Sequence, residues 1–150
     1  MKNIFETEVT QGVIGRIEKL LPNTSAQWGK MNVSQMLAHC NVTYEMVFTD
    51  KHKKPNGIMR FILKSFVKNV VVNESPYKPN NKTAPAFIII DERNFELEKK
   101  RLIEHLVKTQ QLGESHFDNK ESLSFGVLNK TEWNNMFYKH LDHHLKQFGV

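Results

Sequence analysis

The sequence predicts an all-α fold, a four-helix bundle with a long crossover between its second and third main helices. Four stretches place apolar residues at three- and four-residue steps, the spacing of one helix face. Two of these stretches open with a capping-box pattern, and three of the five prolines fall in residues 73–86. With 150 residues, 39% hydrophobic and 25% charged, the chain has the size and composition of one domain, residues 1–150.

The first two helices are delimited by clear start and stop signals. The first covers about residues 6–21, where apolar residues recur at helical spacing, and ends before Pro22. The second begins after Asn32, because Gln35 three residues later completes a capping box. Its apolar face continues to about Thr49.

The crossover is harder to assign. Residues 58–72 are apolar and begin as a helix, but the β-branched tail at 70–72 favours an extended end. Residues 73–86 indicate an irregular connection, and residues 87–90 a short strand or an extended segment. If the segments 70–72 and 87–90 paired as strands, the fold would be α+β, and this alternative stays open.

The last two helices follow. Asp91 is a suitable N-cap for a helix that runs to about Leu112 and ends at Gly113. Residues 114–128 are expected to form a loop. Asn129 and Glu132 form a second capping box, which opens the final helix.

The composition and charge of the chain limit the kinds of partner that it can have. One cysteine excludes an internal disulfide, the first residues lack the apolar run of a signal peptide, and no segment approaches membrane-spanning length. We therefore expect a cytoplasmic protein with no membrane partner. The net charge of +5 is mild, and the basic residues near the crossover lack an interleaved aromatic patch, so we expect no nucleic-acid partner. Those basic residues are Lys51, Lys53, Lys54, Arg60, Lys64 and Lys68.

Two histidines of the final helix are the strongest functional signal. His140 and His144 are four residues apart, so both lie on the helix face that carries Trp133 and Phe137. Two imidazoles at this spacing can bind one divalent cation, although the glutamate of a zinc-protease signature is missing. The alternative is that one histidine bonds a backbone or side-chain group and the others are solvated. Buried imidazoles need partners in either case.

A third histidine could complete the site. His39 lies inside the second helix, and neighbouring helices pack closely enough for their side chains to meet. Three histidine ligands and one open position are typical of a catalytic zinc-type site. The remaining candidates are weaker: we expect His143 at the rim, Cys40 as a buried free thiol, and three histidines at the surface. These three are His52, His105 and His116.

Several segments together resemble a known family. The run from Trp28 to His39, with Glu132-Trp133, His140, His144 and Gln147 near the end, is similar to the DinB/YfiT-like superfamily. The ending His-Leu-Asp-His-His-Leu-Lys-Gln-Phe-Gly-Val resembles a branch catalogued as a domain of unknown function. The resemblance implies a four-helix bundle and a divalent metal, often nickel or zinc, on His39, His140 and His144. It also implies frequent dimers and thiol-dependent transferase or isomerase activity, or hydrolase activity, with low-molecular-weight thiols as cosubstrates.

The chain departs from this pattern at one place. Relatives of that branch carry a His-Pro pair shortly before the Phe-Gly that precedes the last helix, and the segment 122–126, Ser-Leu-Ser-Phe-Gly, lacks it. If that histidine lines the site in relatives, the departure predicts altered or lost activity.

Two functions remain as hypotheses. The first is a metal-dependent transferase or hydrolase acting on a small molecule. In it Asp142 and Gln147 orient the imidazoles, and Glu45 is a base only if it turns inward. The second is a non-enzymatic module with a Met- and Phe-rich cavity that binds a small ligand or a partner helix.

Overall fold

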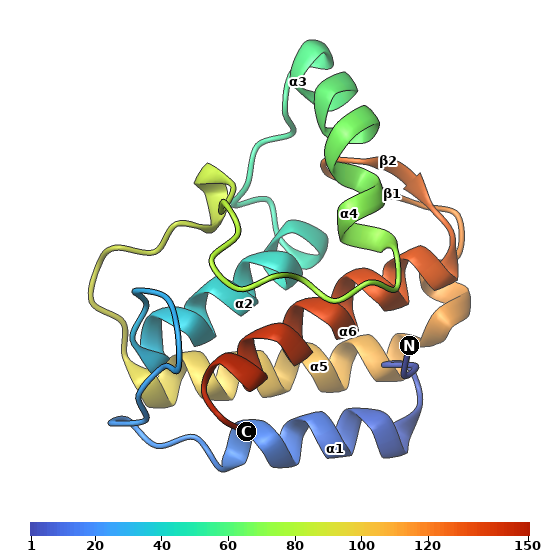
Figure 1. Ribbon diagram of the computed structural model, residues 1–150. Helices are drawn as coiled ribbons and strands as arrows, with labels where there is room; N and C mark the ends of the chain where they lie inside the picture. The colour runs from blue at the N-terminus through green and yellow to red at the C-terminus, as the bar shows by residue number, and fades with distance from the viewer.

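The protein is mostly helical, as a computed structural model of residues 1–150 shows (Figure 1). The predicted helical class is therefore confirmed. The elements in chain order are α1 (Thr7–Glu18), α2 (Val33–Phe48), α3 (Gly57–Ile62), the π-helix η1 (Leu63–Val67), α4 (Lys68–Val72), the 3-10 helix η2 (Pro85–Phe87), α5 (Phe95–Phe117), β1 (Lys120–Ser122), β2 (Gly126–Leu128) and α6 (Lys130–Gln147). None of the helices combines the length and apolarity needed to cross a lipid bilayer.

Side-chain caps fix the starts of the main helices. Both predicted capping boxes are present, Asn32 with Gln35 on α2 and Asn129 with Glu132 on α6. Helix α5 begins three residues later than predicted, because the side chain of Asn94 caps it by accepting from the backbone amide of Leu97. Asp91 is instead paired with Arg93.

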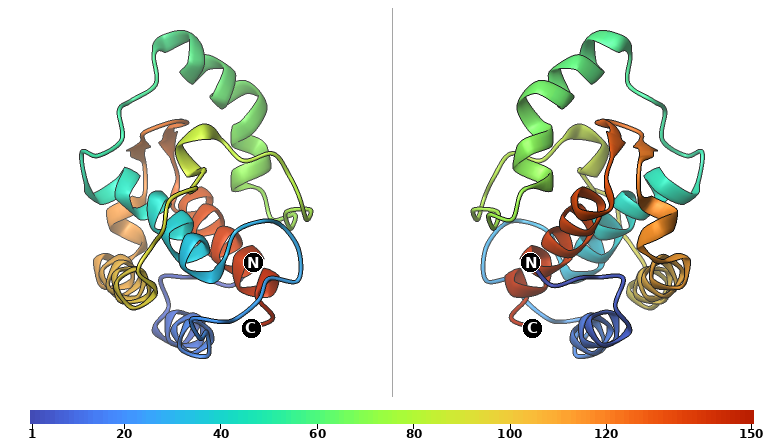
Figure 2. Two further views of the ribbon diagram at one scale, coloured as in Figure 1. Left: turned by 90° about the vertical axis from the view of Figure 1, so that its left-hand side faces the viewer. Right: turned by 90° about the vertical axis from the view of Figure 1, so that its right-hand side faces the viewer.

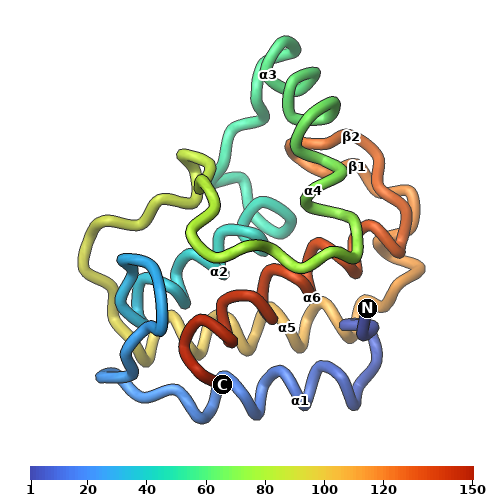
Figure 3. The backbone as a smooth tube through the Cα atoms, in the orientation of Figure 1, coloured from blue at the N-terminus to red at the C-terminus, as the bar shows by residue number.

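The four longest helices are α1, α2, α5 and α6, and they carry most of the core residues. The backbone tube shows how the paths of these helices lie in the molecule (Figure 3). Aromatic rings fill the end of the core near the N-terminus. Phe137 stacks on Tyr44 with ring centroids 5.2 Å apart and contacts Trp133 and Phe117 at 5.4 Å. The opposite end of the same α2–α6 contact holds histidines rather than aromatic residues, and this is where the candidate site lies.

The apolar segment 58–72 is helical throughout, so the prediction of an extended tail at 70–72 is wrong. The reason is tertiary: Lys139 donates to the carbonyls of Val70 and Asn73, and Asn135 donates to that of Val72. These bonds satisfy the last carbonyls of α4, which outweighs the local β-propensity. Residues 87–90 form no strand either, so the α+β alternative does not hold.

The small sheet lies where a loop was predicted. Helix α5 is interrupted at Gly113, whose φ of 72° is open mainly to glycine, and continues for one more turn to Phe117. Strands β1 and β2 then pair antiparallel, with Lys120 opposite Leu128. Ser122 closes the hairpin by donating to the carbonyl of Gly126 and accepting from the amide of Phe125.

Candidate metal centre

Three imidazoles from two helices meet in one place. His39 comes from α2, and His140 and His144 stand one turn apart on α6. Each offers one nitrogen, and these three atoms lie within 4.8 Å of one another. The Nε2 atoms of His39 and His140 are 2.9 Å apart. The structure thus brings together the three histidines that the sequence singled out, which we call the trihistidine cluster.

The Nδ1 atom of every imidazole in the cluster has its own oxygen partner. His39 Nδ1 is 2.8 Å from the carbonyl of Phe87, His140 Nδ1 is 2.9 Å from the Thr43 hydroxyl, and His144 Nδ1 is 2.8 Å from Gln147 Oε1. An imidazole that donates through Nδ1 presents the lone pair of Nε2. The three contacts therefore suit neutral imidazoles whose Nε2 atoms all serve as ligands.

Burial keeps these imidazoles neutral. His39 and His144 are buried and His140 is partly exposed. Burial, followed by the proximity of His39, lowers the pKa of His144 to about 3. Burial, followed by the proximity of His144 and His39, also holds the pKa of His140 well below its usual range. The pKa of His39 is lowered by burial, although its bond to the Phe87 carbonyl acts in the opposite direction. Neutral imidazole is the form that binds metal.

The contact of His144 is anchored by the segment before α2. Gln147 accepts from His144 and, through Nε2, donates to the carbonyl of Trp28 at 2.6 Å. Gly29 has a φ of 85°, and a Cβ there would lie 2.6 Å from Gln147 Nε2. Glycine at this position therefore allows the amide of Gln147 to approach the backbone and hold the imidazole. The predicted orienting role of Gln147 agrees with these contacts.

Two residues around the cluster escaped the sequence analysis. Thr43 is four residues after His39, and this spacing on α2 could have revealed it. Phe87 belongs to the crossover, and no sequence pattern indicates that it lies near the histidines. Besides its carbonyl, Phe87 contributes its ring, whose centroid lies 5.4 Å from that of His39 and 5.7 Å from that of His140. Residues of the crossover thus cover one side of the cluster.

Two predicted site residues lie outside the cluster. Asp142 pairs with Arg16 and Lys146, and the hydrogen bonds that orient the three imidazoles come from other residues, so the expectation that Asp142 orients them is wrong. Glu45 turns away to bind Lys51, His52 and Arg101. Burial by itself would raise the pKa of Glu45, but the hydrogen bonds from these three side chains outweigh it and lower the pKa to about 2. It is therefore a structural anion and not a base.

The other histidines and the cysteine divide between core and surface. His116 is exposed, as expected, and His52 is partly buried beside Glu45. His105 was expected at the surface, but it stacks on Tyr44 at 5.5 Å and bonds Asn41, which draws it into the helix interface. Cys40 is a buried free thiol, as predicted, and burial raises its pKa, so it is not a ready nucleophile.

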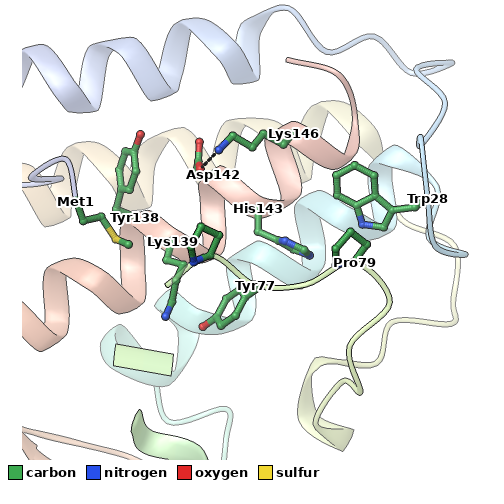
Figure 4. Close-up of a pocket in the computed structure, with 10 residues that line it drawn as sticks. Met1, Trp28, Tyr77, Pro79, Tyr138, Lys139, Asp142, His143 and Lys146 are labelled. Carbon is green, nitrogen blue, oxygen red and sulfur yellow. Dashed lines mark ion pairs between the residues drawn. The ribbon is translucent and has the colours of Figure 1, made fainter. Parts of the chain in front are cut away.

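A small cavity lies beside His143, the residue before His144 of the cluster (Figure 4). Its volume is about 120 Å³. His143 lies between the rings of Trp28 and Tyr77, at centroid distances of 5.8 and 5.6 Å, and its own ring is 5.0 Å from that of His144. The indole Nε1 of Trp28 is buried without a hydrogen-bond partner. His143 thus lines the cavity and also contacts His144, while none of the three clustered imidazoles lines the cavity itself.

The sequence departure at 122–126 lies in the hairpin and not in the cluster. Ser122 uses its hydroxyl within the turn. All three histidines meet without a contribution from this segment.

Comparison with known proteins gives one match. The family model described as "Protein of unknown function (DUF1569)" matches residues 5–149. No curated protein and no solved structure matches the chain.

Proposed function

The chain belongs to the DUF1569 family, and we propose that its His39, His140 and His144 hold a divalent cation, nickel or zinc, with one coordination position left open. The observation that carries the proposal is the set of three Nδ1 contacts, to Phe87, Thr43 and Gln147. Metal-binding histidines nearly always have such a partner on the other ring nitrogen. Imidazole ligands suit zinc and nickel.

We further propose that the protein is a metal-dependent enzyme, a thiol-dependent transferase or a hydrolase that acts on a small molecule. A cation at this site supplies Lewis acidity, which lowers the pKa of a water or a low-molecular-weight thiol that binds to it. The chain's own residues keep the imidazoles neutral and aligned, and Phe87 limits the access of water. The cavity next to His143 has room for a small substrate only.

The fold supports a place in the DinB/YfiT-like superfamily, which we also propose. Helices α1, α2, α5 and α6 share one core, and the long crossover lies between α2 and α5. The three histidines occupy the second and fourth of these helices, as in that superfamily.

The direct test is the metal content of the purified protein. We expect about one equivalent of divalent metal in the wild type after incubation with nickel or zinc and desalting, measured by elemental analysis. His140→Ala should lose it, because two ligands remain. His116→Ala removes an exposed histidine outside the cluster and should keep the wild-type content.

The outcomes separate the hypotheses. The enzyme hypothesis is supported if the wild type and His116→Ala bind metal, His140→Ala does not, and the protein shows metal-dependent activity. That activity would be hydrolysis of a nitrophenyl ester or transfer of a thiol to chlorodinitrobenzene. If metal binds but neither reaction occurs, the metal site is supported and these two reactions are excluded. No metal in any form contradicts the site and leaves the non-enzymatic binding module.

The Gln147 contact gives a second prediction. Gln147→Leu removes the acceptor for His144 Nδ1 while keeping the size of the side chain. We expect a 10–100-fold weaker metal affinity, as found for residues that orient metal ligands. The measurement is competition with a chromophoric chelator. Gln111→Leu, an exposed change on α5, serves as the control and should leave the affinity unchanged.

A further inference from the structure

One segment stands apart from the core. Residues 57–72, comprising α3, η1 and α4, project from the four long helices and form one end of the molecule in every view (Figures 1 and 2). We call this segment the arm. Ion pairs hold it against the rest of the protein: Arg60 pairs with Glu121 of the hairpin at 2.6 Å, and Lys68 pairs with Glu132 of α6 at 2.7 Å. The polar side of the arm thus faces inward.

The side facing solvent is apolar. Ile58, Ile62, Phe66 and Val70 recur every four residues, and Phe61 lies beside them. Phe61 is 68% exposed and Phe66 is 73% exposed, and neither belongs to the core. Soluble proteins rarely expose a continuous apolar surface of this kind unless it meets a partner. Because the inward ion pairs fix the orientation, the apolar stripe cannot simply turn inward.

The stretch of chain that contains the arm, residues 51–73, carries charge of a single sign. Between Asp50 and Glu74 the chain carries six lysines and arginines and no carboxylate. Outside residues 51–73 there are 15 basic and 16 acidic residues, so this segment accounts for the whole positive charge of the protein. Carboxylates elsewhere bind four of the six cations, but Lys53 and Lys64 have no carboxylate partner. The partner is therefore expected to be anionic.

Apolar exposure and positive charge together select the partner. Nucleic acid would satisfy the cations but leave the phenylalanines and isoleucines uncovered. A second copy would cover them but would bring two cationic segments together, which opposes association. A helical segment with an exposed apolar face, in a stretch of chain that also carries unpaired lysines, matches the interface of an anionic bilayer, where both features are satisfied.

We propose that the arm binds the surface of an anionic lipid bilayer, with Ile58, Ile62, Phe66 and Val70 inserted at the headgroup level. The sequence predicts no membrane partner, because no segment is long enough to span a bilayer. Binding at the interface needs no such segment. This inference is independent of the trihistidine cluster, and His140→Ala should bind vesicles like the wild type.

The test is co-sedimentation with vesicles of phosphatidylcholine alone or mixed with phosphatidylglycerol. We expect binding to the mixed vesicles, weakened by added salt, and little binding to phosphatidylcholine. Lys53→Gln with Lys64→Gln should lower the partition coefficient about 30-fold, at about 1 kcal/mol for each cation near an anionic surface. Phe61→Ser with Phe66→Ser should lower it more than about 10-fold, through the lost apolar burial.

A matched double variant on the opposite side of the molecule is the control. Leu21→Ser with Lys19→Glu changes one exposed apolar and one exposed basic residue near the end of α1 and should bind normally. Circular dichroism checks that every variant is folded. The proposal is overturned if the wild type ignores anionic vesicles, or if the control loses binding as much as the arm variants do. A dimer by light scattering that Phe61→Ser with Phe66→Ser dissociates would equally overturn it and assign the arm to a second copy.

Discussion

Lowering the pH from 7 to 5 is expected to reduce the free energy of unfolding of the metal-free protein by about 2 kcal/mol through His144 alone. Burial lowers the pKa of this imidazole to about 3 from an ordinary 6.5. Below pH 6.5 the unfolded chain takes up a proton that the folded protein excludes, so stability falls as the pH falls. The loss grows to roughly 4 kcal/mol as the pH approaches 3, and His39 and His140 act in the same direction.

Urea unfolding at a series of pH values, in the presence of a chelator, measures this effect. His144→Gln cannot titrate and should show a shallower dependence, by up to about 1.4 kcal/mol for each pH unit below 6.5. His116→Gln, at an exposed position, should retain most of the wild-type dependence. Equal slopes for the wild type and His144→Gln would show that His144 is not held neutral by burial.

Phe137→Ala is expected to lower the free energy of unfolding by about 3–5 kcal/mol, because it opens a cavity in the aromatic core. Phe137 is fully buried, stacks on Tyr44, and also meets Phe5, Phe117 and Trp133. Its neighbours on three helices and the N-terminal segment cannot all move in to fill the space. Urea unfolding monitored by circular dichroism gives the value.

Phe66→Ala is the matched control for this change. It removes the same ring from the exposed side of the arm, where the side chain is not part of the core. Its effect on stability should stay within about 0.5 kcal/mol. A comparable loss in both variants would mean that the arm packs against the core in solution, and would contradict the orientation described above.

The helices and the metal candidates could be predicted from the sequence because they rest on local patterns. The capping boxes at Asn32 and Asn129 fixed the starts of α2 and α6. The four-residue spacing placed His140 and His144 on one face, and the apolar stripe indicated that this face was buried. His39 could be predicted only as a candidate third ligand, because its contact with α6 depends on how two helices distant in sequence pack together.

The remaining features depend on contacts that the sequence does not encode locally. The β-branched run at 70–72 became helical because Lys139 and Asn135 bind its carbonyls from α6. The hairpin at 120–128 is too short for an alternating pattern to be visible. Asp142 and Gln147 seemed equivalent in sequence, but Arg16 from α1 captures the first and the Trp28 carbonyl holds the second.

The support of the trihistidine cluster ends on main-chain atoms at two of its three points. His39 donates to the carbonyl of Phe87, and the Gln147 amide that holds His144 donates to the carbonyl of Trp28. A peptide oxygen is the same whichever amino acid bears it, so positions 87 and 28 can vary among relatives without changing these bonds. Of these two carbonyl contacts, only the one at Trp28 is reflected in a neighbouring residue type, the glycine at position 29. A search for relatives with the same geometry should therefore compare the backbone paths around the histidines. A comparison of residue identities at positions 28 and 87 would miss these two contacts.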